Sequence, residues 1–157
     1  GKGAVHNETE LAVLIGKTLK NASIAEVADA IWGYSLALDL TLREVQAELK
    51  KLGRPWEIAK GFDGACPVAG FVDKGRVSNA QQLAFTLQVN GETRQQGNTA
   101  SMIRGINQLI SEMSSHFTLQ PGDIVLTGTP AGVGPLHSGD TLQLQLADLF
   151  TVNSRVN

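Results

Sequence analysis

Two glutamates near the start of the chain, Glu8 and Glu10, have the residue type and spacing expected of a metal site. They are two positions apart at the beginning of a predicted β-strand, where side chains alternate between the two faces. Both carboxylates, together with His6, are therefore predicted to share one face. Like charges this close repel unless a cation lies between them, and oxygen ligands suit Mg²⁺, Mn²⁺ or Ca²⁺. The alternative is a solvated strand end, where acidic residues are common and short motifs match by accident.

Asp39 is a candidate third carboxylate. It follows an alternating apolar stretch that is predicted to be a strand, and it lies between Leu38 and Leu40. A carboxylate among apolar residues is costly in free energy unless it is paired or binds a cation. Because a helix is predicted immediately afterwards, the alternative role of Asp39 is to cap that helix.

Arg43 and Gln46 lie three residues apart on this predicted helix and therefore share a face. Next to acidic strand ends, a guanidinium and an amide can orient a carboxylate or a carbonyl group. Lys60, which follows Trp56 and Ile58, can hold an anion, or transfer a proton if its pKa is lowered. The alternatives are a solvated helix face for the first pair and a surface lysine with a packed stem for Lys60.

The segment Thr127-Gly128-Thr129-Pro130 follows a short apolar run and precedes two further glycines. Small residues at the end of a strand allow backbone amides to approach an anion. Turn formation explains the same glycines without any ligand. The pattern G-x-x-x-x-G-K-[ST] does not occur in the sequence, so nucleotide binding is not supported.

The elements that must position these residues follow from the apolar pattern. Residues 11–15 form an apolar run that predicts a buried strand ending at Gly16. A capping box, Ser23 with Glu26 three residues later, predicts a helix that ends near Gly33. The alternating residues that come next predict a strand.

A second capping-box pattern, Thr41 with Glu44, predicts the helix that carries the arginine and the glutamine. Its apolar residues recur at helical spacing and form a stripe, and Gly53 is the predicted end. The stripe consists of Leu42, Val45, Leu49 and Leu52. Residues 54–82 are rich in glycine and proline and are predicted to be mostly loop, with a short extended piece at 68–72.

The second half of the chain contains several strands and one helix. Residues 83–89 alternate up to Asn90-Gly91, a type I′ hairpin signal, and the return strand covers 93–95. A helix is predicted to start near Thr99. Its packing side consists of Ile103, Ile106, Leu109, Ile110, Met113 and Phe117. Further strands are predicted at residues 124–126, 142–146 and 150–156. This mixture is typical of an α+β fold.

Composition limits the class of protein. The 157 residues, 42% hydrophobic and 18% charged, suffice for one domain with a hydrophobic core. A formal net charge of -2 gives no basic surface for nucleic acid or anionic membranes. No apolar run is long enough to span a bilayer. Cys66 is the only cysteine, which excludes an internal disulfide and fits a reducing, cytoplasmic location; we expect its thiol to be buried and inert.

Taken in order, several segments resemble the fumarylacetoacetate hydrolase family, and most closely its small single-domain members that act on acylpyruvates or oxaloacetate. The matching segments are residues 6–11 (HNETEL), 37–46 (ALDLTLREVQ), 55–63 (PWEIAKGFD) with 66–67, 89–92 (VNGE) with 94–97 (RQQG), and 122–130 (GDIVLTGTP) with 132–135. Each segment alone is weak evidence for the resemblance, but the ordered set covers nearly the whole chain and is specific for the family.

The resemblance implies a layered mixed β-sheet roll with flanking helices, formed by residues 1–157 as a single catalytic domain that is usually a homodimer. It implies that Mg²⁺ or Mn²⁺ is held by Glu8, Glu10 and Asp39. It also implies a substrate pocket, including the catalytic groups, formed by Arg43, Gln46, Lys60 and Thr129. Thr129 and its neighbouring backbone amides would receive the substrate carboxylate.

The chain departs from the family pattern at its start. Family members of this kind carry several dozen residues before the Glu-x-Glu strand, including a mobile lid with a His/Glu pair for acid–base chemistry. Here five residues precede His6, so we expect either an N-terminal truncation or the loss of the lid. Asn7 also fills a position where the family often has an aromatic or imidazole side chain.

The predicted activity is metal-dependent hydrolysis of a C–C bond in an acylpyruvate-type 2-oxo acid. Such a substrate chelates the cation through a carboxylate oxygen and its keto oxygen, and the cation stabilises the enolate. Within the family, the alternatives are oxaloacetate decarboxylation and isomerisation of a 2-hydroxy-dienoate, neither of which requires attack by water. The alternative from another class is a non-catalytic remnant that kept the metal site.

Overall fold

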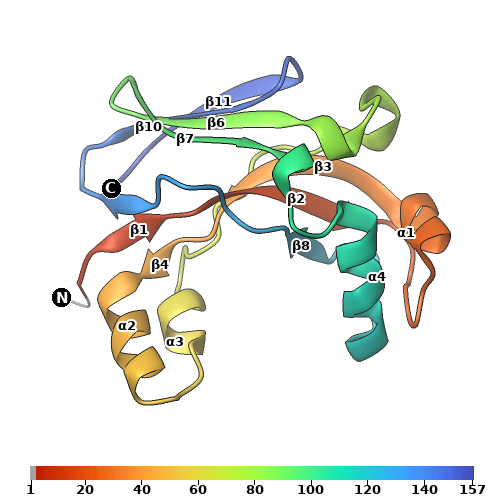
Figure 1. The fold of residues 1–157 in the computed structure, drawn as a ribbon. Helices are drawn as coiled ribbons and strands as arrows, with labels where there is room; N and C mark the ends of the chain where they lie inside the picture. The colour runs from red at the N-terminus through yellow and green to blue at the C-terminus, as the bar shows by residue number, and fades with distance from the viewer. Residues whose placement is uncertain (1–2) are drawn as a thin grey trace.

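Three β-sheets form the framework of the protein, whose structure is a computed structural model that describes residues 3–157 (Figure 1). The fold class is α+β, as predicted, and the sheets are arranged in layers with helices at their ends. Among the described residues, every strand pairing is antiparallel. No helix within residues 3–157 has both the length and the apolar character needed to cross a lipid bilayer.

The central sheet has the strand order β5-β3-β2-β8. Its strands are β5 (Val72–Asp73), β3 (Ile31–Leu38), β2 (Thr9–Ile15) and β8 (Ile124–Leu126). β2 and β3 are almost entirely buried, which explains their near-continuous apolar sequences. Thr9 lies opposite Leu38, so the start of β2 is adjacent to the end of β3.

A small sheet with the order β4-β1-β9 continues from the central one. Its strands are β1 (Val5–Asn7), β4 (Thr41–Leu42) and β9 (Gly134–Leu136). The chain leaves β1 and enters β2 at Glu8, which belongs to neither strand. The predicted strand of the two glutamates is therefore interrupted at Glu8, where the chain passes from one sheet to the next.

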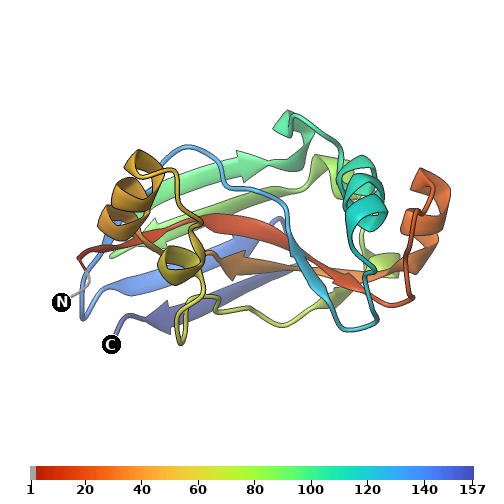
Figure 2. The same cartoon turned by 90° about the horizontal axis from the view of Figure 1, so that it is seen from below.

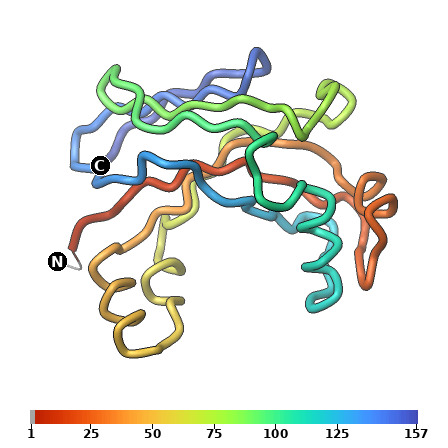
Figure 3. The backbone as a smooth tube through the Cα atoms, in the orientation of Figure 1, coloured from red at the N-terminus to blue at the C-terminus, as the bar shows by residue number. Residues whose placement is uncertain are grey.

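The third sheet, ordered β11-β10-β6-β7, packs across the central sheet, as the backbone trace shows (Figure 3). Its strands are β6 (Ala84–Val89), β7 (Glu92–Asn98), β10 (Thr141–Leu146) and β11 (Phe150–Arg155). The predicted hairpin is confirmed: β6 and β7 are joined at Asn90-Gly91, and both residues have positive φ. Between the sheets lies one apolar core that includes Leu11, Leu36, Leu87, Leu144 and Leu146.

Helix α1 (Ile24–Ala30) has the predicted capping box, with Ser23 and Glu26 satisfying each other's backbone amides. It ends at Ala30 rather than near Gly33, because Ile31 already begins β3. A Cβ on Gly33 would collide with the carbonyl oxygen of Val72, so the glycine serves close strand pairing and not helix termination.

The helix predicted from Thr99 is shorter and begins later. Residues Thr99–Ser101 form a 3-10 turn, η3, in which the Asn98 side chain accepts from the Ala100 amide, and α4 spans Ile106–His116. Ile103 is fully exposed and Phe117 largely so; the prediction that they pack was wrong because both lie outside the helix. Ile106 and Ile110 are buried as predicted. The remaining short turns are η1 (Lys74–Arg76) and η2 (Ala80–Gln82).

Helices α2 (Arg43–Lys51) and α3 (Glu57–Lys60) lie together at one end of the sheets, and α1 and α4 lie at the other (Figures 1 and 2). The second predicted capping box was wrong: α2 has no side-chain cap, and the Thr41 hydroxyl donates to the Asp39 carbonyl at 3.1 Å. The apolar stripe is covered only in part: Leu42 is buried, Val45 and Leu49 are half-buried, and Leu52 is half exposed. Within α2 itself the buried residue is Gln46.

Candidate metal centre and substrate pocket

Three carboxylates meet where β1, β2 and β3 come together. Glu8 lies at the crossing between β1 and β2, Glu10 is the second residue of β2, and Asp39 follows β3. Antiparallel pairing of β2 with β3 brings these positions together, and the Asp39 amide donates to the Glu8 carbonyl at 2.8 Å. One carboxylate oxygen from each residue lies within 4.8 Å of the other two. The structure thus brings together all three predicted ligands.

Burial sets the charge of this cluster. Glu10 is 5% exposed, and burial, with the nearby carboxylates of Asp39 and Glu8, raises its pKa to about 7 against the opposing hydrogen bond from the Gly128 amide. Burial also acts to raise the pKa of Glu8, but hydrogen bonds from Lys60 and Arg43 outweigh it and lower that pKa. The Glu10 carboxyl group is therefore mostly protonated below a pH of about 7, and additional positive charge nearby would favour its ionised form.

Two cationic side chains border the carboxylates. The Lys60 ammonium donates to Asp39 Oδ2 at 2.6 Å and to Glu8 Oε2 at 2.9 Å. Burial disfavours the ammonium, yet these hydrogen bonds outweigh that effect, so the pKa of Lys60 is raised. With these neighbours alone, this is the opposite of the lowered pKa that proton transfer by Lys60 would require, and the side chain places a positive charge beside the carboxylates.

Arg43 and Gln46 lie on the side of α2 that faces the cluster. Arg43 donates through one nitrogen to Glu8 and through another to Gln46 Oε1, the latter at 2.6 Å. Gln46 is 6% exposed, so its amide is withdrawn from solvent and fixes the guanidinium. His6, on β1, has its pKa lowered by burial and by Arg43 against the effects of Glu8 and Glu44.

The donor set fits a divalent cation. Three carboxylates within 4.8 Å face two cationic side chains, so negative charge is in excess when all three are ionised. The Lys60 ammonium sits against two of the carboxylates in the way that a bound cation would. Carboxylate oxygens are the ligands that Mg²⁺ and Mn²⁺ favour, which agrees with the predicted cofactor.

The loop after β8 lies beside the glutamate ligands. The Gly128 amide donates to Glu10, and the Thr129 hydroxyl donates to the Thr9 carbonyl at 2.9 Å. A cavity of about 490 Å³ adjoins this loop. Its polar lining includes Gln96, Asn98, Thr99, Arg104, Thr127 and Thr129. The role of Thr129 in receiving a substrate carboxylate stays a prediction. Its loop lies next to the carboxylate cluster, because Gly128 contacts Glu10.

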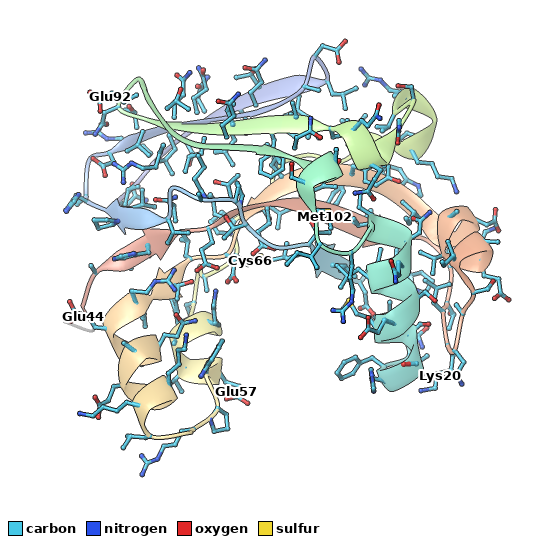
Figure 4. All side chains as sticks on the ribbon, viewed as in Figure 1. Lys20, Glu44, Glu57, Cys66, Glu92 and Met102 are labelled. Carbon is cyan, nitrogen blue, oxygen red and sulfur yellow. The ribbon has the colours of Figure 1, made fainter. Side chains whose placement is uncertain are left out.

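Sequence reasoning missed two residues of this region. Gln95 on β7 is buried and contacts both Thr9 and Thr129; the available signal was a polar side chain within a return strand. Cys66 was predicted to be buried but is exposed, because the loop turns Ala65 inward instead. Figure 4 places Cys66 beneath the crossing strands, between α3 and α4. Partial desolvation of this exposed residue, together with the charges of Asp39 and Glu10, raises the pKa of its thiol.

The sequence resembles known proteins over its full length. The family model described as fumarylacetoacetate (FAA) hydrolase C-terminal matches residues 1–157. The oxaloacetate tautomerase YcgM of Escherichia coli (strain K12) is 57% identical over 155 residues, covering 98% of this chain and 70% of the relative.

Solved structures agree with the fold. A fumarylacetoacetate hydrolase family protein from Yersinia pestis CO92 superposes with a TM-score of 0.97 at 59% identity, covering 99% of this chain and 71% of that one. Fumarylpyruvate hydrolase from Pseudomonas aeruginosa, in complex with Mn²⁺ and pyruvate, superposes with a TM-score of 0.93 at 36% identity. That match covers 98% of this chain and 66% of the hydrolase.

Proposed function

Because the chain belongs to the fumarylacetoacetate hydrolase family, we propose that it is a divalent-metal-dependent enzyme that interconverts the keto and enol forms of oxaloacetate. Acylpyruvate hydrolysis was the first expectation from the sequence. The identity of 57% to an oxaloacetate tautomerase favours the alternative, enolate chemistry without attack by water.

One observation carries the proposal: three carboxylates within 4.8 Å are bordered by the cations Lys60 and Arg43. Such a site can hold a divalent cation and still present positive charge to an anionic substrate. Oxaloacetate is a small dianion, and its enolate carries further negative charge next to one carboxylate. The charge pattern is therefore complementary to the species formed during tautomerisation.

Each predicted pocket residue has a defined task in this proposal. Lys60, which donates to Asp39 and Glu8, would stabilise negative charge on the substrate oxygens. Arg43 binds the substrate carboxylate, and Gln46 holds the guanidinium in place by accepting its hydrogen bond. The backbone amides of Thr129 and its neighbours would also bind that carboxylate, because the Thr129 hydroxyl already donates to the Thr9 carbonyl.

Glu8, Glu10 and Asp39 would hold the metal, which we propose to be Mg²⁺ or Mn²⁺. The bound cation supplies Lewis-acid polarisation of the 2-oxo group. Glu10 would have to be ionised to bind it, so below a pH of about 7 metal binding would be coupled to the release of a proton.

The test is a spectroscopic assay of enol-oxaloacetate with purified protein. We expect the protein with Mg²⁺ or Mn²⁺ to speed the loss of enol absorbance above the buffer rate, and chelation of the metal to remove this effect. Arg43→Gln should raise KM for oxaloacetate, because it removes the group that binds the carboxylate. An absence of metal-dependent tautomerisation in the wild-type protein would exclude the proposal.

Hydrolysis of an acylpyruvate is the second candidate, favoured by the match to the hydrolase solved with Mn²⁺ and pyruvate. The same preparation should be offered acetylpyruvate and fumarylpyruvate, with release of pyruvate followed by a coupled assay. A higher kcat/KM for either acid than for enol-oxaloacetate would favour hydrolysis. We also propose that residues 1–157 act as one domain within a homodimer.

A further inference from the structure

We propose that Gln95 is a positioning residue that fixes the backbone between the two glutamate ligands, and that the same side chain couples this backbone to the Thr129 loop. The inference rests on the proposed metal-dependent function. It adds to that function a residue, Gln95, that does not bind the metal but fixes the position of the residues that do.

The Gln95 amide makes four hydrogen bonds from a buried position on β7, where it is 1% exposed. Its oxygen accepts from the Thr9 amide at 2.9 Å and from Asn7 Nδ2 at 2.8 Å. Its nitrogen donates to Thr129 Oγ1 at 2.8 Å and to the Pro130 carbonyl at 3.0 Å. These four bonds use the full capacity of a side-chain amide, which has two donor hydrogens and two acceptor lone pairs.

The orientation of this amide is fixed by its partners. A backbone N–H such as that of Thr9 can only donate, and a backbone carbonyl such as that of Pro130 can only accept. The oxygen of Gln95 must therefore face Thr9, and its nitrogen must face Pro130. A turn of the amide by 180° would break both contacts and leave buried groups without partners, which is costly in free energy.

Thr9 is the residue between the two ligands, and both of its backbone polar groups are held by this network. Its amide donates to Gln95, and its carbonyl accepts from the Thr129 hydroxyl at 2.9 Å. The backbone of Thr9 determines where the side chains of Glu8 and Glu10 start. Loss of the Gln95 amide would remove one hydrogen bond from the Thr9 amide and one from the Thr129 hydroxyl, the two groups through which this backbone is held.

A ring of contacts results, from Gln95 to Thr9, from Thr9 to Thr129, and from Thr129 back to Gln95. The loop also touches a ligand directly, through the hydrogen bond from Gly128 to Glu10. A displacement of the loop therefore changes the metal cluster, and a displacement of the cluster changes the loop. Groups that orient metal ligands in this way typically contribute about 10- to 100-fold to metal affinity.

The test compares Gln95→Met with a matched structural control. Methionine has a similar shape but makes none of the four hydrogen bonds. The control is Ser114→Ala on α4, because Ser114 is also buried, accepts from the Ala22 amide at 2.9 Å and donates to the Ser111 carbonyl at 2.7 Å. Both substitutions should lower the melting temperature, since both remove buried hydrogen bonds. Only Gln95→Met should weaken Mn²⁺ binding, by about 10- to 100-fold.

The measurement is the Kd for Mn²⁺ by calorimetry or by the electron paramagnetic resonance signal of free Mn²⁺, well below the melting temperature of each variant. Equal Kd values for wild-type protein and folded Gln95→Met would overturn the inference. Should Gln95→Met not fold, Thr129→Val tests the same network from its other end. It should weaken Mn²⁺ binding by about tenfold, as loss of a group behind the ligands does, although Thr129 is not a ligand. Unchanged affinity there would equally overturn the inference.

Coupling between the two residues has its own readout. Because both act on Thr9, the Gln95→Met/Thr129→Val variant should lose less Mn²⁺ affinity than the product of the two single losses. Independent, multiplicative losses would refute the coupling. If the wild-type protein binds no Mn²⁺, the proposed function and this inference both fall. If it binds Mn²⁺ but does not tautomerise oxaloacetate, only the function falls, because the Gln95 test measures binding alone.

Discussion

Replacing Glu10 by glutamine should remove a pH-dependent loss of stability from the metal-free protein. Burial and neighbouring carboxylates raise the pKa of Glu10 from 4.5 to about 7. Between these two values, the folded protein binds the proton and the unfolded chain does not. The contribution of Glu10 to the free energy of unfolding therefore falls as pH rises from about 4.5 and levels off above about 7.

The size of the effect follows from the two pKa values. Linkage gives a loss of about 2.5 kcal/mol between pH 5 and pH 8 for a single carboxyl group shifted in this way. Glu10→Gln cannot ionise and should lack this loss. Glu8, whose pKa is lowered, acts in the other direction, but its effect lies below pH 4.5 and outside this window.

The assay is urea unfolding of wild-type protein and Glu10→Gln at pH 5 and pH 8 with a chelator present. We expect the difference in unfolding free energy between the two proteins to change by about 2.5 kcal/mol in favour of the variant at pH 8. Saturating Mg²⁺ should cancel the wild-type loss, because a bound cation stabilises the ionised carboxylate. Parallel pH dependence in the two metal-free proteins would show that burial of Glu10 does not control its charge.

Titration with Mg²⁺ or Mn²⁺ should reveal one site per chain that Glu10→Ala abolishes; full-strength binding by a Glu8→Ala/Glu10→Ala variant would contradict the assignment. Oxalate should raise the melting temperature more with Mg²⁺ than without it, by linkage, and equal shifts would argue against chelation. Ser23→Ala should lower the unfolding free energy by about 1 kcal/mol, because it removes the capping box of α1; no change in urea unfolding would mean that packing alone fixes this helix. Sedimentation should show the homodimer that we propose, and a monomer at micromolar concentration would oppose this.

Local signals in the sequence were sufficient for most elements. The capping box at Ser23 and the hairpin at Asn90-Gly91 depend on neighbouring residues alone, and both are present. The capping box predicted at Thr41 failed because a tertiary contact was stronger. Thr41 is paired with His6 in the small sheet, and its hydroxyl is used by the Asp39 carbonyl.

The apolar stripe of α2 shows a second limit of local patterns. Helical spacing identified which residues share a face but not which face the protein covers. In the structure, Gln46 is buried and accepts a hydrogen bond from Arg43, while Val45 and Leu49 are only half-buried. A polar residue can therefore occupy the most buried position of a helix, and the spacing of residues alone does not reveal this.

Gln95 could not be assigned from the sequence because its partners lie far away in the chain. Asn7 and Thr9 are 88 and 86 residues away, and Thr129 is 34 residues away. A hydrogen bond between distant segments leaves no spacing pattern in a single sequence. The structure identifies Gln95 by its burial. It is a buried polar side chain on a mostly exposed strand, and its neighbours Arg94 and Gln96 are exposed.

The ligand pair itself was found by reasoning that holds only in part. Alternation along one continuous strand predicted that Glu8 and Glu10 share a face, but Glu8 lies outside both strands, at the crossing between two sheets. A residue at such a crossing is not held by a regular ladder on both sides, so its direction depends on other contacts. The amide of Asp39 bonds to the carbonyl of Glu8, and Gln95 holds the next residue, Thr9. The carboxylates converge because three segments meet there, which is why changes behind the ligands should affect metal binding as strongly as we propose.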